Sequence, residues 1–131
     1  MELADLRLDE AALLLEYGRP SGAFYLAGYA VECALKAIIA SRYRGGAWAA
    51  EGTPEGGYHH DLRGLLVQAG LHAAMRKAQR VNKPLAENWY VAVEWKTTSR
   101  YQQFRRRRAE ALVKAIRDEK AKVLPWLKQR V

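Results

Sequence analysis

Cysteine is almost absent from this sequence, and its scarcity excludes two kinds of small protein. The single thiol, Cys33, cannot form an intramolecular disulfide framework or a zinc site built on pairs of cysteines. Because it lies in a stretch rich in Ala, Leu and Ile, we expect Cys33 to be a small buried apolar side chain. The sequence predicts neither a metal site nor a cofactor.

Long apolar runs and targeting signals are also missing. No stretch approaches the roughly 18 consecutive apolar residues that are typical of a membrane span. The chain starts with the acidic segment MELAD, which lacks the basic start and apolar centre of a signal peptide. We therefore expect a cytoplasmic protein that is not associated with a membrane.

Apolar and polar residues do not alternate with a period of two over any useful length, so strands are not expected. What is present is enough apolar material for one core, since 50% of the 131 residues are hydrophobic. Chains of about 100–150 residues most often form one domain. We expect a single domain that covers residues 1–131.

The charge of the chain is strongly asymmetric. Residues 1–60 carry 5 basic and 8 acidic side chains, whereas residues 61–131 carry 17 basic and 6 acidic ones, for a net charge of +8 overall. A basic half on an otherwise mildly acidic domain predicts an acidic partner, either nucleic acid or the acidic surface of a protein.

Helical periodicity and turn signals predict an all-α fold. We expect an antiparallel bundle of four to five main helices with additional short helical turns. The expected helices cover residues 2–17, 20–43, 62–69, 71–80, 84–95 and 102–122, with a final turn at 125–127. The third helix is capped by His60 or Asp61, and the glycine-rich residues 44–58 before it are expected to form a long loop.

The first helix has apolar residues on two opposite faces, which predicts burial on two sides. One face carries Leu3, Leu6, Leu13, Leu14 and Tyr17. The opposite face carries Ala4, Leu8, Ala11, Ala12 and Leu15. The second helix adds a track of small residues, formed by Ala23, Ala27, Ala30, Ala34 and Ala37. This is more apolar surface than one small bundle covers, so we expect a homodimer.

The second helix also contains a charged pair in an otherwise apolar stretch. Glu32 precedes Lys36 by four residues, the favourable order for an ion pair on a helix. Two interpretations are open: a weak pair at the surface, or a Glu32 that a partner holds inside the protein.

Three segments together resemble a known family. The second helix reads GAFYLAGYAVECALKA over residues 22–37, the third begins His60-Asp61-Leu62, and Trp95 is followed five residues later by Arg100-Tyr101. In this order and spacing they resemble the HEPN domain (higher eukaryotes and prokaryotes nucleotide-binding). The resemblance extends from the first helix to the last tryptophan, and the Glu-Cys-Ala-Leu-Lys centre is its most specific element.

The resemblance implies a bundle of four or five helices that usually forms a homodimer. It also implies a partner, because such domains are often encoded beside a minimal nucleotidyltransferase, or fused to one, in toxin–antitoxin pairs. Many members are metal-independent ribonucleases in which four to six residues separate an Arg from the His that follows it. In that chemistry the His moves the proton of the ribose 2′-OH and the Arg stabilises the developing phosphorane charge.

This chain departs from the ribonuclease pattern. No Arg stands at the required distance before any of its three histidines, which are His59, His60 and His72. After Arg100, the positions where the His would stand are occupied by arginines, which do not shuttle protons near neutral pH. We expect a non-catalytic protein. The alternative is a divergent metal-independent ribonuclease that uses Arg100, Arg105 and His60 in a rearranged site.

Two basic clusters are the candidate binding sites. The residues are Arg100, Tyr101, Arg105, Arg106, Arg107 and Arg108 in one cluster, and Arg76, Lys77 and Arg80 in the other. Each cluster is either a solvated surface or a contact for phosphate or carboxylate oxygens. Four nearby aromatic residues are either core residues or platforms on which bases stack: Tyr90, Trp95, Tyr101 and Phe104.

Three functions fit these patterns. The first is a non-catalytic HEPN-like module that binds RNA, a nucleotide or a nucleotidyltransferase-type protein. The second is the divergent ribonuclease, in which His60 is catalytic rather than a residue at the start of a helix. The third is a structural subunit whose basic half docks onto an acidic protein.

Overall fold

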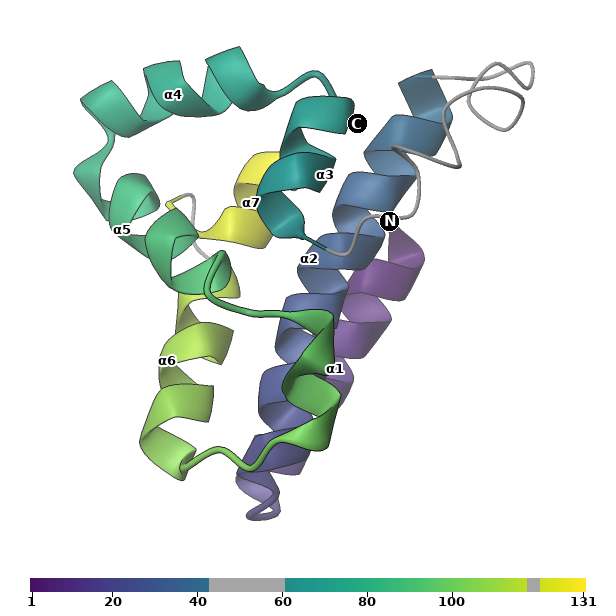
Figure 1. The fold of residues 1–131 in the computed structure, drawn as a ribbon, viewed down its shortest axis with the longest axis vertical. Coiled ribbons are helices and arrows are strands. Elements are labelled where there is room, and N and C mark those ends of the chain that lie inside the picture. Colours follow the sequence, from purple (N-terminus) through teal and green to yellow (C-terminus); the bar gives the residue numbers. More distant parts are fainter. Residues whose placement is uncertain (43–60, 118–120) are drawn as a thin grey trace.

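The computed structural model describes residues 1–42, 61–117 and 121–131, and these residues form an all-α fold (Figure 1). Over these ranges the chain forms seven α-helices and one 3₁₀ helix, without a strand. The elements are α1 (Glu2–Glu16), α2 (Pro20–Arg42), α3 (Leu62–Gln68), α4 (His72–Val81), α5 (Lys83–Ala92), η2 (Thr97–Tyr101), α6 (Arg106–Ile116) and α7 (Val123–Lys128). The predicted all-α bundle is confirmed.

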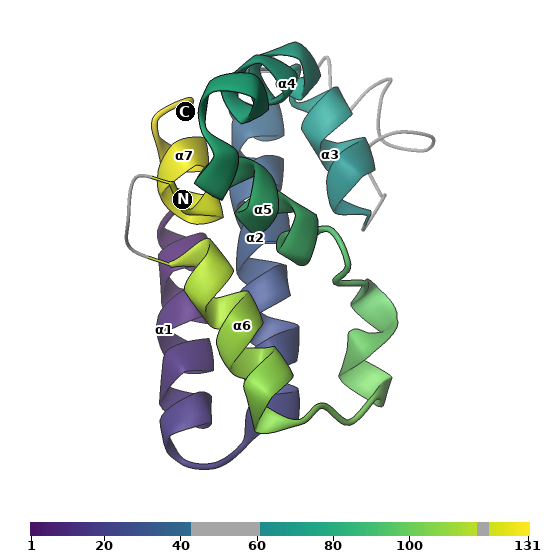
Figure 2. The same ribbon diagram turned by 90° about the vertical axis from the view of Figure 1, so that its left-hand side faces the viewer.

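Helices α1 and α2 form an antiparallel hairpin (Figure 2). Gly18 ends α1 with a φ of +75°, a left-handed conformation that glycine adopts without a steric penalty. Ala4, Leu8 and Ala11 of α1 are buried, whereas the opposite face of the helix is exposed. The two-faced pattern in the sequence therefore corresponds to one face that packs in the bundle and one that faces solvent.

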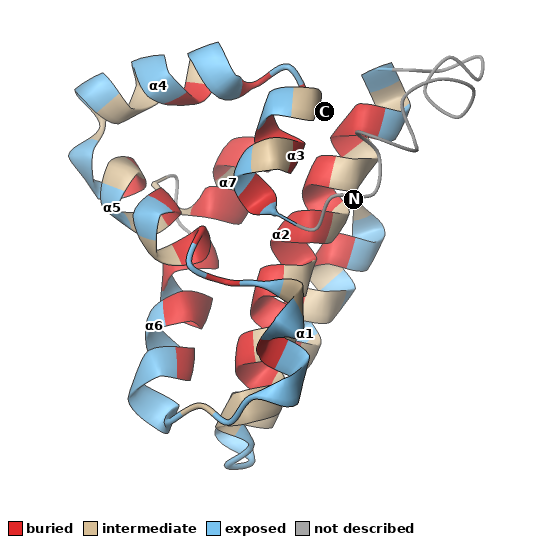
Figure 3. Ribbon diagram, viewed as in Figure 1, coloured by how far each residue is buried: buried red, intermediate tan, exposed pale blue. Residues whose placement is uncertain are grey.

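Helix α2 is the central helix of the fold and contacts α1, α3, α6, α7 and η2. By length and composition it is apolar enough to cross a membrane, so the expectation that no such stretch exists was wrong. Within the described residues, however, 61% of its most apolar window is buried among the other helices, as in the core helix of a bundle (Figure 3).

The charged pair of α2 lies at the edge of the core, with Lys36 partly exposed. Glu32 is buried, and Lys36 Nζ donates a hydrogen bond of 2.9 Å to its Oε2. Cys33, the next residue, is half-buried rather than fully buried, which corrects the sequence-based expectation. Burial is the main reason why the pKa of the Cys33 thiol is raised above its ordinary value.

Side-chain caps set the starts of helices α3 and α5. The Asp61 carboxylate accepts a 3.2 Å hydrogen bond from the Gly64 N–H at the start of α3, which confirms Asp61 as a cap. The Asn82 side chain accepts from the Leu85 N–H at the start of α5, where Pro84 stands in the first turn.

Two predicted helix boundaries were wrong. Helix α5 ends at Ala92 rather than at Trp95, and the last long helix covers Arg106–Ile116 instead of residues 102–122. The later start has a tertiary cause, because the Phe104 N–H donates a 2.8 Å hydrogen bond to Ser21 Oγ at the start of α2. This bond holds the chain before α6 in an extended conformation against α2.

Candidate nucleic-acid interface

The predicted basic cluster of Arg76, Lys77 and Arg80 lies on α4. Leu71 and Met75 are buried and anchor this helix to the core, while Arg76, Lys77 and Arg80 are exposed. Within the described part of the chain, none of these three cations makes an ion pair. We call these three residues the α4 surface, and their charges are available to a ligand.

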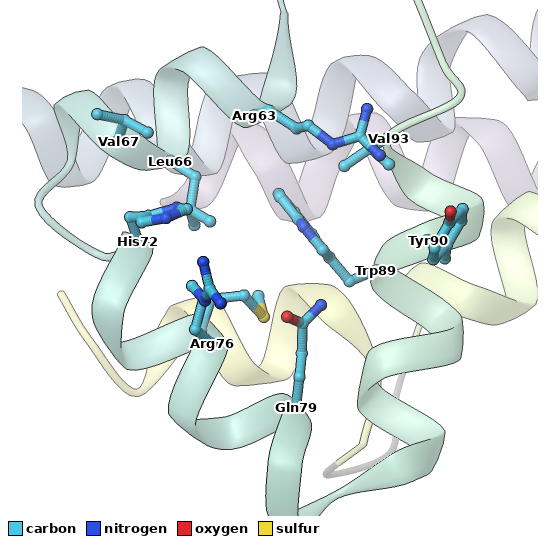
Figure 4. A pocket seen from close by; sticks show the side chains of 10 residues that line it. Arg63, Leu66, Val67, His72, Arg76, Gln79, Trp89, Tyr90 and Val93 are labelled. Carbon is cyan, nitrogen blue, oxygen red and sulfur yellow. The ribbon is translucent and has the colours of Figure 1, made fainter.

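A pocket of about 400 Å³ lies beside the α4 surface, between α3, α4 and α5 (Figure 4). Its floor is apolar and is formed by Leu66, Met75, Trp89 and Val93, all of which are buried. Its rim is polar and is formed by Arg63, His72, Arg76, Gln79 and Tyr90. We call this feature the α3–α5 pocket.

The α3–α5 pocket is electropositive. Of the described residues that line it, two are arginines and none is acidic. In Figure 4, Arg63 extends from α3 and Arg76 from α4, with the indole of Trp89 between them. Of these three residues, the sequence singled out only Arg76, because Arg63 and Trp89 lie 13 residues on either side of it and only the fold brings the three together.

The other predicted cluster lies around the start of α6. Some of its arginines contact the rest of the bundle, and the others face solvent. Arg105, Arg106, Arg107 and Arg108 are all exposed. Arg106 donates a 2.9 Å hydrogen bond to the Glu110 carboxylate and a 3.1 Å hydrogen bond to the Leu15 carbonyl of α1. The guanidinium of Arg108 lies 5.4 Å from the ring centroids of both Phe24 and Phe104. Arg106 and Arg108 therefore hold α6 to the bundle.

Arg105 and Arg107 make no ion pair within the described part of the chain, and they face solvent. Arg100 lies close by in the sequence, on η2, with its guanidinium 4.8 Å from the ring centroid of Tyr101. The Tyr101 side chain is the main cause of the raised pKa of Arg100. We call Arg100, Tyr101, Arg105 and Arg107 the η2–α6 surface.

The structure separates the four aromatic residues into two pairs. Tyr90 and Tyr101 are 69% and 75% exposed, so their rings are open to a base. Trp95 is buried against α2, and the Phe104 ring stacks on Phe24 at a centroid distance of 3.8 Å. The interpretation of Trp95 and Phe104 as stacking platforms is therefore wrong, and both belong to the packing of the bundle.

The alternative catalytic set joined Arg100, Arg105 and His60. Arg100 and Arg105 belong to the η2–α6 surface, whereas His60 lies outside the described residues. His72, which was not assigned a role, is exposed at the start of α4 and lines the α3–α5 pocket. The described residues contain no group of three or more His, Cys, Asp or Glu arranged to hold a metal ion.

No protein-family model, curated protein or solved structure matches this chain. The interpretation of the two basic surfaces and of the α3–α5 pocket therefore depends on their own chemistry.

Proposed function

We propose that the protein is a non-catalytic, HEPN-like module that binds single-stranded RNA. One observation carries the proposal: exposed cations without ion pairs lie close in sequence to an exposed tyrosine at two places. Tyr101 accompanies the cations of the η2–α6 surface, and Tyr90 on α5 follows the cations of α4. Cations of this kind attract the phosphate backbone, and open aromatic rings stack on unpaired bases. Residues 61–131 contain 17 basic and 6 acidic residues, and this excess of positive charge also attracts the phosphate backbone.

Single-stranded RNA fits these surfaces better than a duplex does. Bases in a duplex are stacked on one another, so their faces are not available to Tyr90 or Tyr101. Contacts with phosphates and stacking on base faces carry little sequence information, so the proposal includes little sequence preference.

The test is the binding of the full chain to a fluorescent single-stranded RNA at several salt concentrations. We expect the logarithm of the affinity to fall linearly with the logarithm of the salt concentration. Because each lost phosphate contact reduces that slope by about 0.7, the double variant Arg105→Ala/Arg107→Ala should reduce it by about 1.4. Lys77→Ala/Arg80→Ala should have a similar effect.

Arg42→Ala is the control, because it removes one exposed positive charge that belongs to neither surface. Its slope should equal that of the unmodified protein. No binding at low salt, or a slope that the two double variants leave unchanged, would contradict the proposal. A basic half without RNA affinity would instead favour docking onto an acidic protein, such as a nucleotidyltransferase-type partner.

The non-catalytic part of the proposal has its own measurement. RNA cleavage without a metal requires a group that exchanges protons near neutral pH. The chain has three histidines for this role, and none follows an arginine at the spacing of the ribonucleases it resembles. Purified protein should leave a mixed RNA intact in the presence of EDTA. Cleavage that disappears in His60→Ala or His72→Ala would show that the protein is an enzyme.

A further inference from the structure

The α3–α5 pocket has a property that RNA binding along a basic surface does not require. An extended phosphate backbone needs only exposed cations, whereas this pocket has a floor of four buried apolar side chains, including the indole of Trp89. A concave apolar floor with a few polar groups at its rim is typical of sites for small molecules. Its volume of about 400 Å³ accommodates one ring system with one acidic group.

The cations at the rim define the charge of the ligand. Arg63 and Arg76 come from different helices and make no ion pair within the part of the chain that the structure describes. No described acidic residue lines the pocket to neutralise them. The planar forks of two arginines bind the oxygens of a phosphate or a carboxylate with paired hydrogen bonds.

The floor defines the shape of the ligand. Trp89 and Met75 are both at the floor, where an indole favours stacked or edge-on aromatic rings and a thioether contacts ring edges. Gln79 and Tyr90 stand at the rim, where an amide and a hydroxyl can donate to or accept from polar atoms on the ring. Figure 4 shows Gln79, Trp89 and Tyr90 among the side chains that line the pocket.

We propose that the α3–α5 pocket binds a small aromatic anion, with its planar ring on the floor at Trp89 and Met75 and its phosphate or carboxylate between Arg63 and Arg76. This inference goes beyond the proposed function. It requires neither the η2–α6 surface nor a polymeric ligand.

Calorimetric titration of the full chain tests the proposal with defined probes. Adenosine 5′-monophosphate, uridine 5′-monophosphate and indole-3-acetate each combine a ring with an acidic group, and we expect at least one of them to bind saturably. Adenosine lacks the anion and inorganic phosphate lacks the ring, so each should bind at least tenfold more weakly than the best probe. Preference for the nucleotides identifies phosphate as the anion, and preference for indole-3-acetate identifies carboxylate.

Four variants locate the binding. Arg63→Gln and Arg76→Gln should each weaken the best probe by about tenfold or more, because each removes a charge-assisted hydrogen bond. Arg80→Ala removes one positive charge from α4 outside the pocket lining, and should leave the affinity for the probe unchanged. Val67→Trp fills the pocket from an exposed lining position while both arginines remain, and should abolish binding.

Several results would overturn the proposal. These are no saturable binding of any aromatic anion at millimolar concentration, equal affinity for inorganic phosphate, or binding that survives Arg63→Gln/Arg76→Gln. RNA affinity separates this failure from failure of the proposed function. Val67→Trp should retain RNA binding, whereas Lys77→Ala/Arg80→Ala should lose part of it and keep the affinity for the small anion.

Discussion

Gly28 and Trp95, which are far apart in the sequence, pack directly against each other. A Cβ atom added to Gly28 would lie 2.1 Å from Cγ of Trp95, so the indole lies directly on the backbone of α2. Trp95 is almost completely buried, and the same ring lies 6.0 Å from the ring of Tyr25. Because Trp95 precedes η2 in the chain, this contact also positions the segment that carries Arg100 and Tyr101.

We predict that Gly28→Ala destabilises the protein, although alanine is the better helix former by about 1 kcal/mol. Overpacking of a rigid ring against backbone costs about 1–3 kcal/mol or more, which exceeds that gain. Gly22→Ala, in the same helix, is the control, because its new methyl group would meet only the end of the flexible Leu14 side chain at 3.1 Å. Urea unfolding should show a lower midpoint for Gly28→Ala and a nearly unchanged one for Gly22→Ala. Equal midpoints would contradict the prediction.

The contacts that the sequence predicted correctly at the residue scale are local. The Glu32–Lys36 pair and the Asp61 cap join residues three or four positions apart, a spacing that helix geometry brings together. The contact of Trp95 with Gly28, and the common pocket of Arg63 and Trp89, join residues that are far apart in the sequence. Neither could be predicted, because no periodicity encodes which helix packs on which.

The first turn of α6 carries positive charges that are unfavourable at the start of a helix. The first three residues of the helix are Arg106, Arg107 and Arg108. Contacts compensate at two of the three positions. Arg106 bonds to Glu110 of the same helix and to the Leu15 carbonyl of α1, and Arg108 lies over two rings. The sequence placed the four arginines in one cluster, because the contacts with Leu15, Phe24 and Phe104 that separate them depend on the fold.

We predict opposite effects of two neighbouring substitutions at the start of α6. Arg108→Ala should destabilise the protein by about 0.5–1 kcal/mol, because it removes the cation from the stacked Phe24 and Phe104 rings. Arg107→Ala should be neutral or stabilising by a few tenths of a kcal/mol, because it removes only an unfavourable charge. Chemical unfolding of both variants under identical conditions measures the difference. A loss of stability that is equal in the two would show that Arg108 contributes no specific contact.

At the scale of the whole molecule, the α3–α5 pocket and the exposed apolar face of α1 are formed by different helices. Helices α3 and α4, which contribute to the pocket lining and carry the α4 surface, lie away from α1 in both views of the fold (Figures 1 and 2). The outer face of α1 exposes a stripe of large apolar residues, namely Leu3, Leu6, Leu13 and Tyr17. A contact through α1 therefore leaves the cationic pocket open to ligand.

We predict that the protein forms a homodimer through this stripe on α1. Leu3, Leu6 and Leu13 are each about half exposed, and Tyr17 is 72% exposed, so their association removes apolar surface that the bundle does not cover. Light scattering should give about twice the 14.8 kDa chain mass. Leu6→Glu/Leu13→Glu should shift the protein to the monomer, because association would bury carboxylates without partners.

Val81→Glu is the control for the dimer, because Val81 is 85% exposed at the end of α4 and lies outside the stripe. This variant should remain dimeric, which separates a specific contact of α1 from a general effect of added negative charge. Since the pocket is formed by α3, α4 and α5 of one chain, the Leu6→Glu/Leu13→Glu monomer should also retain its affinity for small aromatic anions. A mass of one chain for the unmodified protein at all micromolar concentrations would contradict the dimer and leave the exposed face of α1 to another partner.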